Sequence, residues 1–162
     1  MIRKIVRTKK WKKLRRRVWE KRLEQQLSLL SHQYRPSIES TLKLAWGPFY
    51  GGSVMLNRSC TKAAITIQIP YDRYITANEG DVMSRYRIPK QALPYFILFH
   101  EYSHLLDALA HIRHSDENSL TAYKAAMIGA AHASSDYRNL PFEMQADRFA
   151  YQQYMRLRAE VG

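Results

Sequence analysis

Hydrophobic and polar residues alternate with a period of two in the segment AAITIQIP, residues 63–70, where Ile65, Ile67 and Ile69 are separated by polar side chains. This period is typical of a β-strand with one buried face. The segment SVMLN precedes it, and RSCTK can turn the chain between the two. We therefore predict a β-hairpin, with a short third strand at RYIT, residues 73–76, and with Pro70 preventing extension on one side.

From residue 89 onward the hydrophobic positions recur at the three- and four-residue steps of α-helices. The pattern predicts helices over about residues 90–111, 117–133 and 141–158. A hairpin followed by a run of helices indicates an α+β fold, in which a small antiparallel sheet packs on a helical core.

The N-terminal segment RTKKWKKLRRRVWEKRLEQQLSLL has apolar residues at helical steps with cations between them. These apolar positions are Trp11, Leu14, Val18, Leu23, Leu27 and Leu30. The pattern predicts a basic amphipathic helix, and it divides the chain into an arm, residues 1–34, and a body, residues 35–162.

The net charge of +12 is concentrated in this arm, because residues 1–22 hold 12 of the 26 Lys and Arg residues and a single acid, Glu20. Residues 23–162 hold 14 basic and 13 acidic residues, so the body is almost neutral. The arm is therefore either a contact to nucleic acid or an anionic surface, or a solvated helix whose apolar stripe packs on the body. The candidate contact residues are Lys9, Lys10, Lys12, Lys13, Arg15, Arg16 and Arg17.

A chain of 162 residues with 46% hydrophobic residues can bury the core of one ordinary domain. The single cysteine, Cys60, excludes an internal disulfide and a thiolate zinc knuckle, so nitrogen and oxygen atoms must hold any metal. We find no apolar run of transmembrane length and no signal-peptide pattern, and we expect a cytoplasmic protein.

The segment ILFHEYSHLLDAL, residues 97–109, places polar groups inside an apolar helix. His100 and His104 project in parallel from consecutive turns, so their ring nitrogens can converge on one Zn²⁺, and Glu101 can reach a water beside it. A metal would satisfy buried groups that are costly to leave unpaired. The alternative is a pair of core histidines bonded to backbone or carboxylate groups.

The helix predicted over LPFEMQADRFAYQQYM offers a third ligand. Glu143 and Asp147 lie one turn apart on the same face as the small residues Ala146 and Ala150, which allow a second helix to approach closely. Glu143 can complete a site of three protein ligands, and Asp147 can accept the other ring N–H of a ligand histidine. The alternative is an exposed Glu143 and a surface salt bridge from Asp147 to Arg148 or Lys124.

Together, HEYSH and EMQAD resemble the gluzincin branch of the zincin metallopeptidases. The combination of a short sheet, this helix and a later P-F-E-x-x-A-D-x-F-A helix is similar to the small ImmA/IrrE-type peptidases, over about residues 45–158. The resemblance implies a helical zincin core that holds one Zn²⁺, and a sheet edge that receives an extended substrate.

By this resemblance, His100, His104 and Glu143 match the zinc ligands, Glu101 the general base, and Asp147 the partner of a ligand histidine, His100. We therefore expect a zinc metallopeptidase that hydrolyses a peptide bond in an intracellular protein. Glu101 would take a proton from the water and later deliver it to the leaving amine.

An oxyanion in the transition state also needs a hydrogen-bond donor. The candidates are Tyr137, His132, His114 and Tyr151. We favour Tyr137 because it lies shortly before Glu143 in the chain.

The chain departs from the family pattern in its basic arm and in the long connector between His104 and Glu143, which contains an extra predicted helix. A SprT-like, DNA-associated protease with His111 or His114 as third ligand is an alternative, but it leaves Glu143 and Asp147 unexplained. Two further alternatives are a non-catalytic, metal-stabilised module that binds nucleic acid through the arm, and a helical scaffold without a metal.

Overall fold

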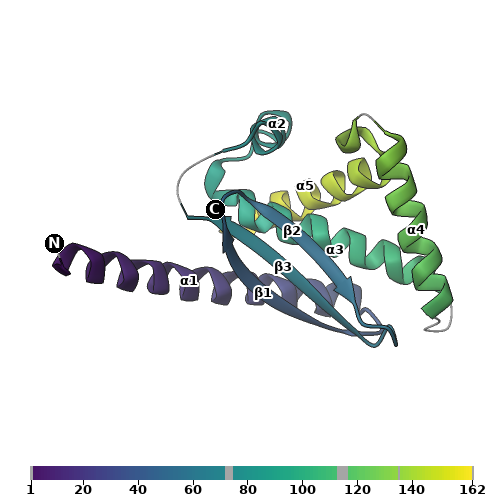
Figure 1. Ribbon diagram of the computed structural model, residues 1–162, viewed down its shortest axis with the longest axis horizontal. Helices are drawn as coiled ribbons and strands as arrows, with labels where there is room; N and C mark the ends of the chain where they lie inside the picture. The colour runs from purple at the N-terminus through teal and green to yellow at the C-terminus, as the bar shows by residue number, and fades with distance from the viewer. Residues whose placement is uncertain (1, 72–74, 113–116, 135, 162) are drawn as a thin grey trace.

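A computed structural model describes residues 2–71, 75–112, 117–134 and 136–161, with side chains from residue 13 to residue 160. It confirms the α+β class (Figure 1). The principal elements are α1 (Ile2–Tyr34), β1 (Glu39–Gly47), β2 (Gly51–Leu56), β3 (Lys62–Pro70), α2 (Ala77–Tyr86), α3 (Leu93–His111), α4 (Glu117–Ala133) and α5 (Pro141–Val161). Two short 3-10 helices, η1 (Lys90–Ala92) and η2 (Tyr137–Asn139), precede α3 and α5.

The sheet has the order β1-β3-β2, and the predicted hairpin is its antiparallel pair β2–β3. The alternation predicted in β3 is confirmed, since Ile65, Ile67 and Ile69 are fully buried. The prediction that the sheet is wholly antiparallel is wrong, because β1 runs parallel to β3 along its whole length. Strand β1 was not predicted. It lies on the opposite side of β3 from β2, so the connection from β1 to β2 crosses over β3.

The predicted third strand at residues 73–76 lies partly outside the described residues, and Ile75 and Thr76 are not in a strand. Thr76 instead begins the unpredicted helix α2 with a capping box. Its hydroxyl accepts the backbone N–H of Glu79, and the Glu79 carboxylate accepts the backbone N–H of Thr76. The same carboxylate accepts the backbone N–H of Tyr50 at 2.8 Å, which ties α2 to the start of β2.

Helices α3, α4 and α5 confirm the three helices predicted in the second half of the chain. Helix α3 is the central element, because it contacts the sheet as well as α1, α4 and α5. Its buried residues include Leu98, Phe99, Tyr102 and Leu105, so the chemistry-bearing residues of this helix are held in a rigid core.

Helix α1 differs in its two halves. Leu23, Leu27 and Leu30 are buried in the main core, whereas the N-terminal half projects beyond the sheet (Figure 1). Leu14 and Val18 are 59% and 41% exposed. The predicted apolar stripe is therefore not continuous. Leu23 follows Val18 by five residues, which places its side chain about 140° away around the helix axis, on another face of α1.

None of the described helices combines the length and the apolar character that a membrane span requires.

Candidate metal centre

The centre is built on α3, where His100 and His104 stand one turn apart. Their Nε2 atoms lie 3.0 Å from each other, so both rings point to the same place. This convergence follows from the helix, since side chains four residues apart lie one above the other on the same face.

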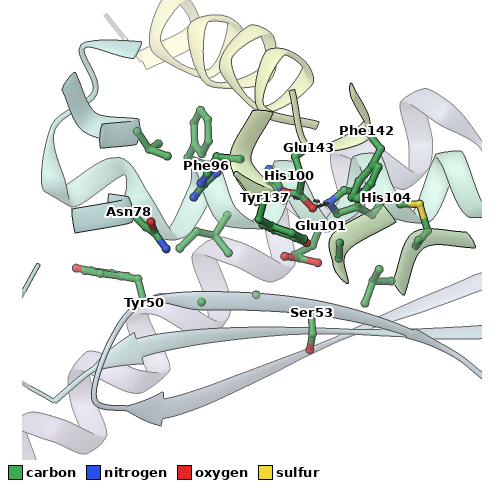
Figure 2. A pocket seen from close by; sticks show the side chains of 18 of the residues that line it. Tyr50, Ser53, Asn78, Phe96, His100, Glu101, His104, Tyr137, Phe142 and Glu143 are labelled. Carbon is green, nitrogen blue, oxygen red and sulfur yellow. Dashed lines mark hydrogen bonds and ion pairs between the residues drawn. The ribbon is translucent and has the colours of Figure 1, made fainter. Parts of the chain in front are cut away.

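Glu143, in the first turn of α5, completes the group (Figure 2). Its Oε2 lies 3.1 Å from Nε2 of His100 and its Oε1 lies 3.4 Å from Nε2 of His104. The two helices come close enough because Ala146 and Ala150, which are buried, leave little side chain between them. The candidate ligand atoms of all three residues lie within 4.8 Å of one another.

The donor set fits a metal ion. Glu143 is only 2% exposed, yet its Oε1 has no hydrogen-bond partner among the described side chains. A buried carboxylate oxygen without a partner is costly, and a cation between the three residues would satisfy it. Two imidazole nitrogens and one carboxylate form a ligand set of catalytic zinc sites, which keep a further position open.

Asp147 contacts the His100 ring at Nδ1, the nitrogen that faces away from Glu143 and His104. Its Oδ1 lies 2.8 Å from Nδ1 of His100, so that a proton on Nδ1 leaves the Nε2 lone pair directed at the centre. Nη1 of Arg138 in η2 donates to both oxygens of the same carboxylate, at 3.0 and 3.2 Å. Asp147 is therefore a buried member of the centre, and Arg138 is a contributor that the sequence analysis missed.

The electrostatics of the centre favour a cation. Burial by itself lowers the pKa of His100, but hydrogen bonds to Asp147 and Glu143 outweigh it and raise that pKa to about 9. Burial by itself raises the pKa of the Glu143 carboxyl group, but the neighbouring rings of His100 and His104 and the hydroxyl of Tyr137 keep it well below its usual range. Glu143 thus keeps its negative charge and stabilises positive charge on the neighbouring atoms.

Glu101 lies between the centre and strand β2 (Figure 2). Its close neighbour is Gly52, where an added Cβ would come within 2.5 Å of both Cγ and Oε1 of Glu101. Burial raises the pKa of the Glu101 carboxyl group. The absence of a side chain at Gly52 therefore provides the space that the Glu101 carboxylate occupies. This role of Gly52 is a second contribution that the sequence did not predict.

The centre opens into a cleft of about 750 Å³. One wall of the cleft is the edge strand β2, which pairs with β3 on its other side. The residues of β2 that line the cleft are Gly51 to Val54 and Leu56. Residues of α2, α3, α4, η2 and α5 line most of the remainder of the cleft, so the helix predicted in the long connector, α4, supplies part of it. Its apolar lining on α4 consists of Leu120, Tyr123, Met127, Ile128 and Ala131.

Among the candidate oxyanion donors, Tyr137 lines the cleft beside Glu143. Burial and a hydrogen bond with Glu143 raise its pKa, so the hydroxyl keeps its proton. Tyr151 packs on Tyr86, and His132 is exposed and outside the cleft lining. The candidate His114 lies outside the described residues.

The alternative third ligand His111 is not part of the metal group among the residues that the structure describes. Its Nδ1 lies 2.8 Å from the backbone oxygen of Asp107, one turn earlier in α3. Of the basic residues predicted to contact nucleic acid, Lys13, Arg15, Arg16 and Arg17 lie on the projecting half of α1. The side chains of Lys9, Lys10 and Lys12 lie outside the described part.

No protein-family model matches this chain, and the comparisons with curated proteins and with solved structures found no match either.

Proposed function

We propose that the protein is a zinc-dependent metallopeptidase that hydrolyses a peptide bond in an intracellular protein. The observation that carries this proposal is the convergence of His100, His104 and Glu143 from two helices, with the carboxylate of Glu101 beside them in a cleft. A purely structural metal site has no need of an additional carboxylate or of an open cleft.

Zinc is the metal that this donor set favours, because two imidazoles and one carboxylate suit a borderline-soft ion with tetrahedral geometry. His100, His104 and Glu143 would hold it, and Asp147 would keep His100 in the tautomer that binds. Zinc bound there would lower the pKa of a water molecule towards neutrality and polarise a substrate carbonyl group.

Glu101 is the proposed general base. Its carboxylate is buried and lies on the side of the centre that faces β2, between the proposed metal ligands and the strand. From this position it can take a proton from the attacking water and then deliver it to the leaving amine, which releases the two peptide products. The phenolic O–H of Tyr137 is the proposed donor to the oxyanion.

The substrate is proposed to bind as an extended chain along β2. Gly51 and Gly52 are on the cleft side of this edge strand and carry no side chain that would block an approaching backbone. A peptide can then pair with the strand through main-chain hydrogen bonds, while the apolar side chains of α4 receive its side chains.

The decisive experiment compares the wild type with Glu101→Gln, each loaded with zinc. We expect both to hold about one zinc per chain, and the variant to lose at least 100-fold in cleavage of a denatured protein substrate, because a glutamine cannot take up the proton. Metal analysis and proteolysis followed by mass spectrometry provide the two measurements. Equal cleavage by the two proteins would refute the proposal, and zinc without cleavage in either would leave a structural metal site as the result.

A further inference from the structure

Helix α4 borders the cleft with an apolar face that is only partly covered. The residues that form this face recur at three- and four-residue steps and therefore share one side of the helix. They are Leu120, Tyr123, Met127 and Ala131, and all of them line the cleft. Leu120 is buried, whereas the other three are half-buried. The apolar side of a helix normally packs on the core, but most of this one is left available to a bound chain.

The Tyr123 side chain places this face on the His104 side of the metal centre. Its hydroxyl donates to Oδ2 of Asp107 at 2.9 Å, and Asp107 follows His104 by three residues in α3. The ring of Phe142 lies on the same side, with its centroid 6.1 Å from that of the His104 ring, whereas Tyr50 lies on the other side of the centre (Figure 2). The apolar face of α4 is therefore close to the proposed metal, at one end of the cleft.

The other walls of this end of the cleft are also apolar. Ala108, one turn beyond His104 in α3, lines the cleft with a methyl group only. Val54 and Leu56 line it from β2, which runs in the same direction as α3 (Figure 1). The one charged side chain that α4 contributes to the lining is Lys124, which is exposed and forms no ion pair with another described side chain. This end of the cleft is therefore apolar, with a solvent-exposed cation beside it.

We propose that this end of the cleft is a subsite that selects a bulky apolar side chain of the substrate and rejects a basic one. The inference rests on the proposed peptidase function, because the selected side chain belongs to the extended chain that is proposed to pair with β2. A phenylalanine or leucine side chain gains by leaving water for the apolar face of α4. A lysine or arginine side chain would lose water there, and it would meet the like charge of Lys124. The substrate class is therefore an extended segment with a bulky apolar residue close to the cleaved bond.

The test uses internally quenched peptides that carry phenylalanine, alanine or arginine in turn at each of the positions nearest the cleaved bond. We expect the zinc-loaded wild type to cleave the phenylalanine peptide with a kcat/KM about 10-fold or more above that of the alanine peptide, at one fixed position. Arginine at the same position should lower kcat/KM below the value for alanine, because the subsite offers it a cation and no acid from α4.

Three variants of α4 examine the subsite itself. Ala131→Leu fills part of the subsite and should lower kcat/KM for the phenylalanine peptide by about 10-fold, with little effect on the alanine peptide. Ala125→Leu is the matched control, because Ala125 is exposed and outside the cleft lining, and it should behave as the wild type does. Lys124→Glu should raise kcat/KM for the arginine peptide by about 10-fold relative to the alanine peptide. Circular dichroism of every variant verifies that the fold is retained.

Binding of the labelled peptides to zinc-loaded Glu101→Gln separates this inference from the proposed function. Fluorescence anisotropy should give a Kd about 10-fold lower for the phenylalanine peptide than for the alanine peptide, and Ala131→Leu in the same background should abolish the difference. This preference in binding, without cleavage by the wild type, would refute the peptidase and leave the subsite in place. Cleavage without a preference for phenylalanine, or a preference that neither Ala131→Leu nor Lys124→Glu alters, would overturn the subsite and leave the peptidase. The absence of both cleavage and preferential binding would overturn both.

Discussion

At the scale of single residues, the centre depends on two polar groups, Asp147 and Arg138, that lie behind the proposed ligand His100. Arg138 binds both oxygens of Asp147, and Asp147 binds Nδ1 of His100. A carboxylate that is only 1% exposed is stable as an anion when such donors surround it. The guanidinium therefore offsets the burial of the Asp147 charge, while the carboxylate fixes the orientation of the ring that is proposed to bind the metal.

Gly52 provides a residue-scale prediction. Gly52→Ala would place a methyl group 2.5 Å from Glu101 and 2.6 Å from Cγ2 of Ile97, so the Glu101 side chain has to move. Because displacement of a catalytic group by about 1 Å can cost about 100-fold in rate, we expect a loss of that order in peptide cleavage, with zinc content unchanged. Gly51→Ala is the matched control, since an added Cβ there meets no atom within 4 Å. Similar activities of the two variants would show that Glu101 does not need this space.

These residue-scale features mark the limit of what the sequence could predict. The spacing of His100, His104, Glu143 and Asp147 follows from helix geometry and from the cost of burying polar groups, and the structure brings these four residues together. The contributions of Gly52 and Arg138 depend on how a strand and a 3-10 helix pack against α3 and α5. No local pattern of hydrophobic residues encodes such contacts between distant segments.

At the scale of elements, the difference between local sequence patterns and contacts of distant segments explains which helices and strands were not predicted. Helices α3, α4 and α5 have long periodic patterns, and these were predicted. Strand β1 joins the sheet through a parallel pairing with β3, which is a long-range contact, and α2 is a short helix whose start depends on the Thr76 cap. The capping box T-x-x-E at residues 76–79 was the signal in the sequence that could have revealed α2.

The division of α1 leads to an element-scale prediction. Leu23 is fully buried in the core and Leu14 is 59% exposed, although both belong to the same helix. We expect Leu23→Ala to reduce the free energy of unfolding by about 2–5 kcal/mol, because it removes buried methyl groups and leaves a cavity. Leu14→Ala should change it by less than about 0.5 kcal/mol. Urea titrations followed by circular dichroism measure both, and equal losses would mean that the two halves of α1 pack alike.

At the scale of the whole molecule, the proposed metal connects α3 to α5, so its removal should weaken the entire fold. Without a cation, three polar groups are left close together in a buried site, with Oε1 of Glu143 lacking a hydrogen bond. Zinc at about 1,000 times its Kd would stabilise the folded state by about 4.1 kcal/mol. For a domain of this size that corresponds to a rise in Tm of roughly 8–16 °C, which chelation should reverse.

Differential scanning calorimetry with and without a chelator measures this shift in the wild type and in His104→Ala. The variant lacks one of the three proposed ligands, so its Tm should respond little to zinc or to the chelator. Leu14→Ala, which leaves all three ligands in place, should respond as the wild type does. If the Tm of the zinc-treated wild type were unaffected by chelation, the helices would be held together by packing alone, and the proposal of a metal centre would have to be abandoned.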